Sequence, residues 1–192
     1  LGSHLRGNEE AILDVQTASA RYFQRPDNGH ADLDSTRTSL SGHAGSIMLL
    51  RTGNNTSFRW QAGGAWRSPG FEINDLGYMR RADEINQFVW AGYTRRNPFW
   101  IFNNLSLNAN QWADWDFGGQ ALRQAVNWNT NGQLRSQHDF WGGMTRTFEQ
   151  VSNTALRGGP SAKLPGTLDM EAGFNSDSRK PVQFNLGGWA QL

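Results

Sequence analysis

The feature that most constrains the fold is a two-residue repeat in residues 56–67. Its even positions carry apolar or small residues, namely Phe58, Trp60, Ala62, Gly64 and Trp66. Its odd positions include Ser57, Arg59, Gln61 and Arg67. Successive side chains of a strand point to opposite faces, so one face of this segment is aromatic and the other carries arginines. A strand that stands between hydrocarbon and water requires this contrast.

The same alternation extends along the chain. It is clearest in residues 102–115, where only Gln111 and Trp112 break the pattern. We expect strands over 39–51, 56–67, 85–95, 102–115, 122–135, 140–148, 168–177 and 182–187, with the tail of another strand at 1–7. Most of these segments are longer than the five or six residues typical of soluble sheets, and they suit tilted membrane spans.

The connections give an independent signal, because short turns alternate with longer loops. The short turns are 53–55, 96–101, 136–139 and 178–181, the long loops are 8–37, 68–84 and 149–166, and 116–121 is intermediate. A short helix over 8–23, with Asn8 as its cap, is expected in the first loop. Outer-membrane barrels alternate their connections in this way. We therefore predict an all-β fold, an antiparallel up-and-down transmembrane β-barrel.

Composition supports this class. Nine Trp and eleven Phe indicate an ordered chain, and no apolar run reaches the roughly 18 residues that a membrane helix needs. The net charge of +1 gives no reason to expect nucleic acid, and the lack of cysteine excludes thiolate metal sites. We expect residues 1–192 to be a single segment of about eight or nine strands from a larger barrel, because bacterial barrels close with an even strand number.

Four motifs resemble one known family: Ser-Pro-Gly-Phe-Glu-Ile-Asn-Asp-Leu-Gly-Tyr-Met-Arg-Arg-Ala-Asp at 68–83, with supporting matches at 19–27, 110–118 and 157–160. Nearly the whole chain resembles the C-terminal membrane barrel called domain of unknown function 5916. The resemblance implies a Gram-negative outer-membrane barrel, usually preceded by a module similar to family-nine carbohydrate-binding domains that these residues lack. Hydrolase labels in such proteins rest on that module, and the resemblance supplies no catalytic residues.

Two groups of residues are candidates for a site. The loop motif contributes Glu72, Asp75, Arg80, Arg81 and Asp83, whose charges we expect to pair and order the loop. The end of the strand at 102–115 contributes the candidate ligand-facing residues Trp112, Asp114 and Asp116. Trp112 is the best candidate for an inward ring that stacks on a sugar. Carboxylates held about 5 to 10 Å apart can also hydrolyse glycosides, which keeps an enzyme with Asp114, Asp116 or Glu72 as an alternative.

Other residue types give weaker signals. The histidines, His4, His30, His43 and His138, lack metal-ligand spacing, so no metal, cofactor or catalytic residue is assigned. Trp66, Trp115 and Trp128 share the apolar parity of their strands, and we interpret them as an interfacial girdle near the strand ends.

We predict a barrel segment of the bacterial outer membrane that serves transport, secretion or surface binding. Its polar residues would line the lumen, and the loop at 68–84 would fold over or into it. The expected partners are the lipid bilayer, lipopolysaccharide and the remaining strands of the barrel, with carbohydrate as a further ligand. This interpretation assigns the segment no enzymatic activity. Two alternatives stay open: a carbohydrate-active hydrolase or carbohydrate-binding protein, and a soluble β-sandwich binding module.

Overall fold

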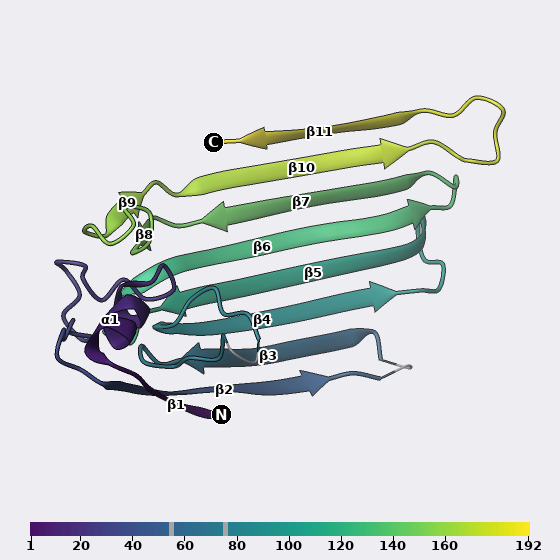
Figure 1. The fold of residues 1–192 in the computed structure, drawn as a ribbon. Coiled ribbons are helices and arrows are strands. Elements are labelled where there is room, and N and C mark those ends of the chain that lie inside the picture. Colours follow the sequence, from purple (N-terminus) through teal and green to yellow (C-terminus); the bar gives the residue numbers. More distant parts are fainter. Residues whose placement is uncertain (54–55, 75–76) are drawn as a thin grey trace.

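A computed structural model describes residues 1–53, 56–74 and 77–192, and its main feature is one antiparallel sheet (Figure 1). Nine strands pair in the order β1-β2-β3-β4-β5-β6-β7-β10-β11, so neighbours in the sheet follow one another along the chain. The strands are β1 (Gly2–Arg6), β2 (Ser39–Arg51), β3 (Phe58–Arg67), β4 (Glu84–Arg95), β5 (Phe102–Trp115), β6 (Ala121–Leu134), β7 (Asp139–Thr147), β10 (Thr167–Asn175) and β11 (Asn185–Gln191). The all-β antiparallel prediction is confirmed.

The long and short connections lie at opposite ends of the sheet (Figure 1). The connections 7–38, 68–83, 116–120 and 148–166 gather at one end, which we call the loop end. The turns that follow β4, β6 and β10 lie at the other, which we call the turn end, as does the end of β2. Residues 54–55 of the predicted turn 53–55 lie outside the described residues. A meander of antiparallel strands produces this segregation whenever long and short connections alternate.

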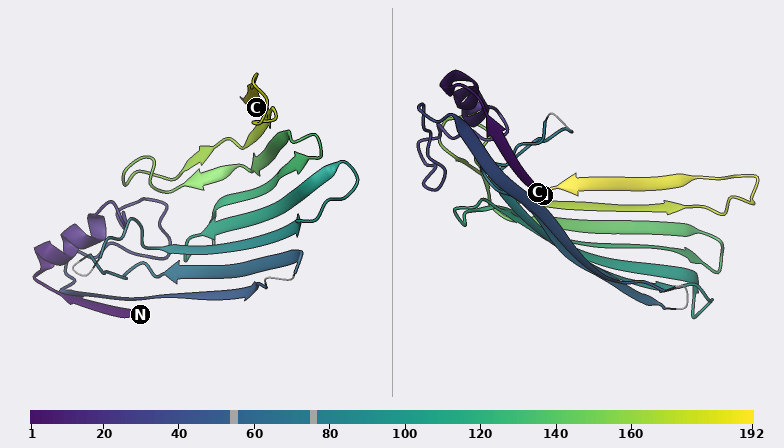
Figure 2. Two further views of the ribbon diagram at one scale, coloured as in Figure 1. Left: turned by 90° about the vertical axis from the view of Figure 1, so that its right-hand side faces the viewer. Right: turned by 60° about the horizontal axis from the view of Figure 1, so that its bottom comes forward.

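The sheet is curved and does not close on itself (Figure 2). β1 and β11 form its two margins, and β1 covers only residues 39–43 of β2, so the rest of β2 has a strand on one side only. The described residues place no second large sheet against it, so the β-sandwich alternative is not the fold. Within the same residues, no helix is long and apolar enough to cross a membrane.

Strand register gives the two faces opposite characters. One row across the sheet contains Trp60, Ala91, Ala109, Trp128, Met144, Met170 and Ala190, and we call its side the apolar face. The next row, on the opposite side, contains Gln61, Trp90, Asn110, Asn127, Thr145, Asp169 and Gln191, and we call its side the polar face. On the polar face the amides of β5 and β6 bond to one another, with Asn108–Asn129 and Asn110–Asn127 both at 2.8 Å.

The apolar face is the face that stays uncovered. Leu107 is 45% exposed and Trp128 is 50% exposed. The other exposed large apolar side chains on this face are Ile47, Leu49, Phe58, Trp66, Ile85, Val89, Tyr93, Met144, Met170 and Leu186. Fewer exposed large apolar side chains lie on the polar face of the described strands, namely Met48, Leu50, Trp141 and Trp189. A soluble sheet buries its apolar face, so this arrangement is the reverse of the usual one.

The compact core lies at the loop end, where the loops pack on the polar face of β1 and β2. One buried cluster joins Ile12, Phe23, Ala31 and Leu40, and a second joins Phe71, Met79 and Ala82. At Gly42 of β2 the backbone of the 68–83 connection comes so close that a Cβ would lie 2.1 Å from the Phe71 nitrogen. This contact fixes that connection directly on the polar face.

The helix α1 (Glu9–Thr17) is shorter than the predicted 8–23. Asn8 caps it as expected, because its Oδ1 accepts a hydrogen bond from the Ala11 nitrogen at 2.9 Å. The chain then leaves the helix at Ala18, and Tyr22 adopts a left-handed φ of 50°. This turn directs Phe23 into the cluster around Ile12, so tertiary packing overrides the helical spacing.

Three further details differ from the sequence predictions. β11 begins at Asn185 and not at 182, because residues 176–184 form a turn in which Arg179 pairs with Asp177 and the Phe184 nitrogen bonds to Ser176. The connection 148–166 contains an unpredicted hairpin, β8 (Gln150–Ser152) with β9 (Ala162–Leu164). Trp128 lies mid-strand in β6, so it does not belong to a girdle at a strand end.

Candidate functional site

Asp83 joins three connections at the loop end. Its Oδ1 atom lies 2.8 Å from His30 Nε2 and accepts a hydrogen bond from the Phe117 nitrogen at 3.0 Å. Its Oδ2 atom lies 3.6 Å from the Arg25 guanidinium. Asp83 is 3% exposed and adopts a left-handed φ of 54°, a conformation that costs free energy for a residue other than glycine. The surrounding contacts therefore determine its position.

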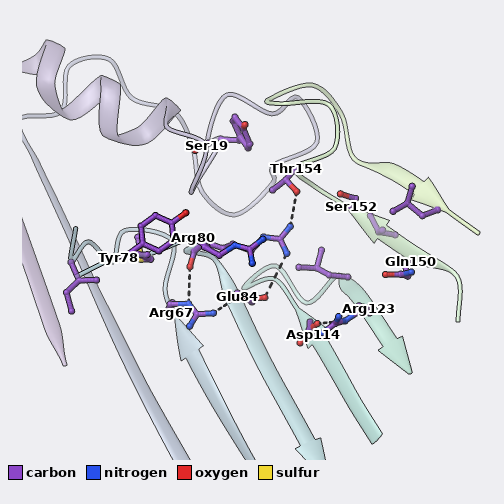
Figure 3. A pocket seen from close by; sticks show the side chains of 17 residues that line it. Ser19, Arg67, Tyr78, Arg80, Glu84, Asp114, Arg123, Gln150, Ser152 and Thr154 are labelled. Atoms are coloured by element: carbon purple, nitrogen blue, oxygen red, sulfur yellow. Dashed lines mark hydrogen bonds and ion pairs between the residues drawn. The ribbon is translucent and has the colours of Figure 1, made fainter. Parts of the chain in front are cut away.

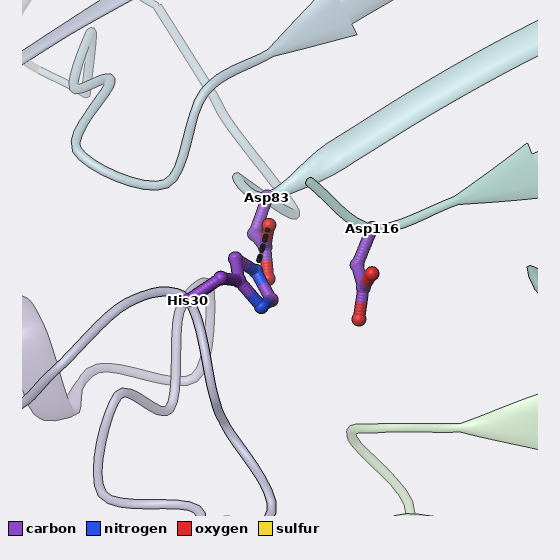
Figure 4. A group of neighbouring side chains, drawn as sticks. All are labelled: His30, Asp83 and Asp116. Atoms are coloured by element: carbon purple, nitrogen blue, oxygen red, sulfur yellow. Dashed lines mark hydrogen bonds and ion pairs between the residues drawn. The ribbon is translucent and has the colours of Figure 1, made fainter. Parts of the chain in front are cut away.

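The same place contains the one grouping of potential metal ligands within residues 1–53, 56–74 and 77–192 (Figure 4). Ligand atoms of His30, Asp83 and Asp116 all lie within 4.8 Å of one another. Asp116 also accepts a hydrogen bond from the Gln120 nitrogen at 2.8 Å. The Arg25 guanidinium beside Asp83 opposes a cation, so these groups act first as a hydrogen-bonded junction between loops. Sequence spacing missed the grouping because its members come from three different connections.

Glu72 is an anchor for the 68–83 connection. Its carboxylate pairs with Arg21 at 2.7 Å and accepts hydrogen bonds from the Ile73 and Asn74 nitrogens at 2.9 and 2.6 Å. Burial raises the pKa of Glu72, but the hydrogen bonds from Asn74 and Arg21 outweigh it, and the pKa is lowered overall. An ionised and fully bonded carboxylate is suited to holding the loop and unsuited to donating a proton.

Arg81 reaches from the 68–83 connection to the 148–166 connection. Its Nη2 atom donates hydrogen bonds to Asn153 Oδ1 at 2.6 Å and Thr154 Oγ1 at 3.2 Å. Beneath it, Arg67 pairs with Glu84 and donates a hydrogen bond to the Arg81 carbonyl at 2.9 Å (Figure 3). The long connections therefore form one bonded assembly over the ends of β3 and β4.

These elements enclose a cavity of about 1010 Å³ on the polar side of the loop end (Figure 3). The strands contribute Arg67, Glu84, Asp114 and Arg123 to its wall, and the connections contribute Tyr22, Tyr78, Arg80, Arg81 and Thr154 among others. Asp114 pairs with Arg123 Nε at 2.9 Å on its floor. Charged side chains from β3, β4, β5, β6 and the 68–83 connection therefore surround this cavity.

The structure separates the predicted residues into two environments. Arg80, Arg81 and Asp114 line the cavity, whereas Asp83 and Asp116 belong to the His30 junction and Glu72 bonds to Arg21. Asp114 and Asp116 therefore face different partners and do not form one isolated pair.

Trp112 lies on the polar face, directly opposite Phe88 of β4, as its parity predicts. Asp75 lies outside the described residues.

Sequence reasoning missed Arg21, Arg25 and His30 as structural partners of the acidic residues, whereas the pairing of Arg67 with a carboxylate was expected and is confirmed with Glu84. Arg21 and Arg25 are buried, at 4% and 5% exposure, and each pairs with an acid of the loop motif. Both arginines lie within residues 19–27, so the resemblance of this segment to the family was the sequence signal that could have identified them. Charge alone could not assign these pairs, because Arg21 and Glu72 are separated by 51 residues.

Two of the family motifs, residues 19–27 and 68–83, thus contain the side chains that bond the loops together. A family model described as a domain of unknown function (DUF5916) matches residues 10–191. The chain belongs to this family. The resemblance drawn from the loop motif is confirmed, and the DUF5916 match extends from α1 to β11. No curated protein and no solved structure matches the chain significantly.

Proposed function

We propose that this DUF5916 chain is a segment of a transmembrane β-barrel in the bacterial outer membrane. The apolar face would contact lipid, and the polar face would line an aqueous interior. One observation carries the proposal: the uncovered face of the sheet is the one with Leu107 and Trp128, whereas the asparagine-rich face carries the packed loops. Contact with lipid makes an uncovered face of that kind favourable, because it removes these side chains from water.

The open margins support the same proposal. β11 and the outer half of β2 each leave one row of backbone groups unpaired, and such edges are not tolerated in hydrocarbon. Further strands of the same barrel would satisfy them. The strand lengths agree, since β5 and β6 have 14 residues each, or about 31 Å across a bilayer at a tilt near 45°.

The role proposed for this barrel is passage, secretion or surface binding. Polar side chains follow the polar face along the length of β5 and β6, and the bonded loops stand over its loop end. In outer-membrane barrels the longer loops lie on the external side, where lipopolysaccharide surrounds them. The loops would then select what enters or binds.

Fractionation of cells that produce the full protein tests membrane placement. The protein should remain in the outer-membrane fraction after a carbonate wash, and it should migrate faster on SDS gels when unheated, as folded barrels do. Liposome swelling with the purified protein then separates a passage role from a binding role. Recovery in the buffer-soluble fraction would rule out the proposal.

Carbohydrate binding is the second candidate, favoured by the polar-face aromatics. Phe88 lies opposite Trp112, and Trp90 lies opposite Asn110 two residues along on the same face. Rings beside amide groups can stack on and hydrogen-bond a sugar. Titration with oligosaccharides should then change tryptophan fluorescence in the native protein and change it less in Trp112→Ala. An unchanged spectrum in both proteins would exclude this candidate.

A further inference from the structure

The cavity at the loop end has an excess of positive charge among its described lining residues. Four arginines line it, Arg67, Arg80, Arg81 and Arg123, against two carboxylates, Glu84 and Asp114. The four come from different parts of the chain: β3, the 68–83 connection and β6. A concave site with one dominant sign of charge concentrates ligands of the opposite sign.

Several guanidinium groups keep N–H donors available. Arg123 bonds to Asp114 through Nε alone, and its side chain is 50% exposed. Arg80 is exposed and has no hydrogen-bond or ion-pair partner among the described residues. Arg67 and Arg81 are held by Glu84, Asn153 and Thr154, so they supply charge from fixed positions.

We propose that this cavity binds a soluble anion that carries two or more phosphate or carboxylate groups. Arginine N–H donors match both groups in geometry and charge. A cavity of about 1010 Å³ lies at the upper end of ligand-binding pockets and is much larger than a single phosphate needs. The proposal goes beyond the barrel function, because it depends on the loop assembly and not on the surrounding lipid.

Isothermal titration of the purified full protein in detergent, with tripolyphosphate and citrate as probes and maltotriose as the neutral probe, tests the proposal. Tripolyphosphate or citrate should bind, and its affinity should fall as the salt concentration rises. Maltotriose should not displace the bound anion. Arg123→Gln should weaken anion binding about tenfold or more, because a charge-assisted hydrogen bond is lost. Arg135→Gln is the matched control, since Arg135 is an exposed arginine at the turn end.

Asp114→Asn separates the proposal from a loss of folding. It removes a carboxylate that competes for Arg123 and leaves an amide of the same shape, so anion affinity should rise. Equal affinity in Arg123→Gln and Arg135→Gln, or no anion binding by the native protein, would overturn the proposal. Either result would leave membrane placement unaffected, since fractionation and heat-dependent migration measure that separately.

Discussion

The environment of the apolar face can be tested at Trp128. This side chain is the eighth of 14 residues in β6. In the proposed barrel, with strands tilted near 45°, it would lie about 17 Å below the loop end and close to the bilayer midplane. Trp128→Lys and Trp128→Ala both remove the indole ring. The difference in stability between these two variants therefore reports the cost of the lysine charge. A lipid-facing Lys at this depth should lower the free energy of unfolding by about 2–4 kcal/mol relative to Ala.

Urea unfolding in lipid vesicles measures this difference. The matched pair is Asn129→Lys and Asn129→Ala on the polar face, where the difference should stay within about 0.5 kcal/mol. At Trp66, one residue from the loop end of β3, the penalty should fall to about 0–1 kcal/mol. If Trp128→Lys and Trp128→Ala are equally stable, the apolar face does not contact hydrocarbon and the reasoning is refuted.

Two further predictions concern the loop assembly. Gly42→Ala should destabilise the protein by about 1–3 kcal/mol and expose the 68–83 connection to protease, because the new Cβ overlaps the loop backbone. Gly29→Ala, which meets nothing within 4 Å, is its control, and equal protease resistance would contradict the packing. Glu72 has a lowered pKa in the folded state, so its stabilising contribution is present above its ordinary value of 4.5 and is lost as pH falls through the folded pKa. Glu72→Gln should therefore flatten the stability curve in that acid range, and an unchanged acid slope would count against the Arg21 pairing.

The fold was predictable to the extent that it depends on local pattern. Residues 102–115 alternate so regularly that the predicted strand and β5 share both ends, and Trp112 lies on the polar face that its parity indicates. Cross-strand alignment was not predictable, because it depends on register. Trp90 is aromatic, like Trp60 and Trp128 on the apolar face. Its pairing with Gln61 and Asn110 nevertheless places it on the polar face.

The loop site was predictable in its members and not in its contacts. The motif at 68–83 identified Glu72, Arg81 and Asp83, but their partners lie in other connections. Local sequence carries no information on which distant arginine meets which acid, since the pairs form only when the loops pack on β1 and β2. Proximity in sequence was equally uninformative for Asp114 and Asp116. These two acids are two residues apart, but Asp114 pairs with Arg123 and Asp116 lies beside His30 and Asp83.

The most direct measurement for the account is paired cysteine labelling across the sheet. Single replacements at Trp60 and Trp128 report on the apolar face, and replacements at Gln61 and Asn129 report on the polar face one residue away. In intact membranes the first pair should react only with lipid-soluble thiol reagents and the second pair with water-soluble ones. Ready labelling of Trp60→Cys and Trp128→Cys by water-soluble reagents would contradict the account.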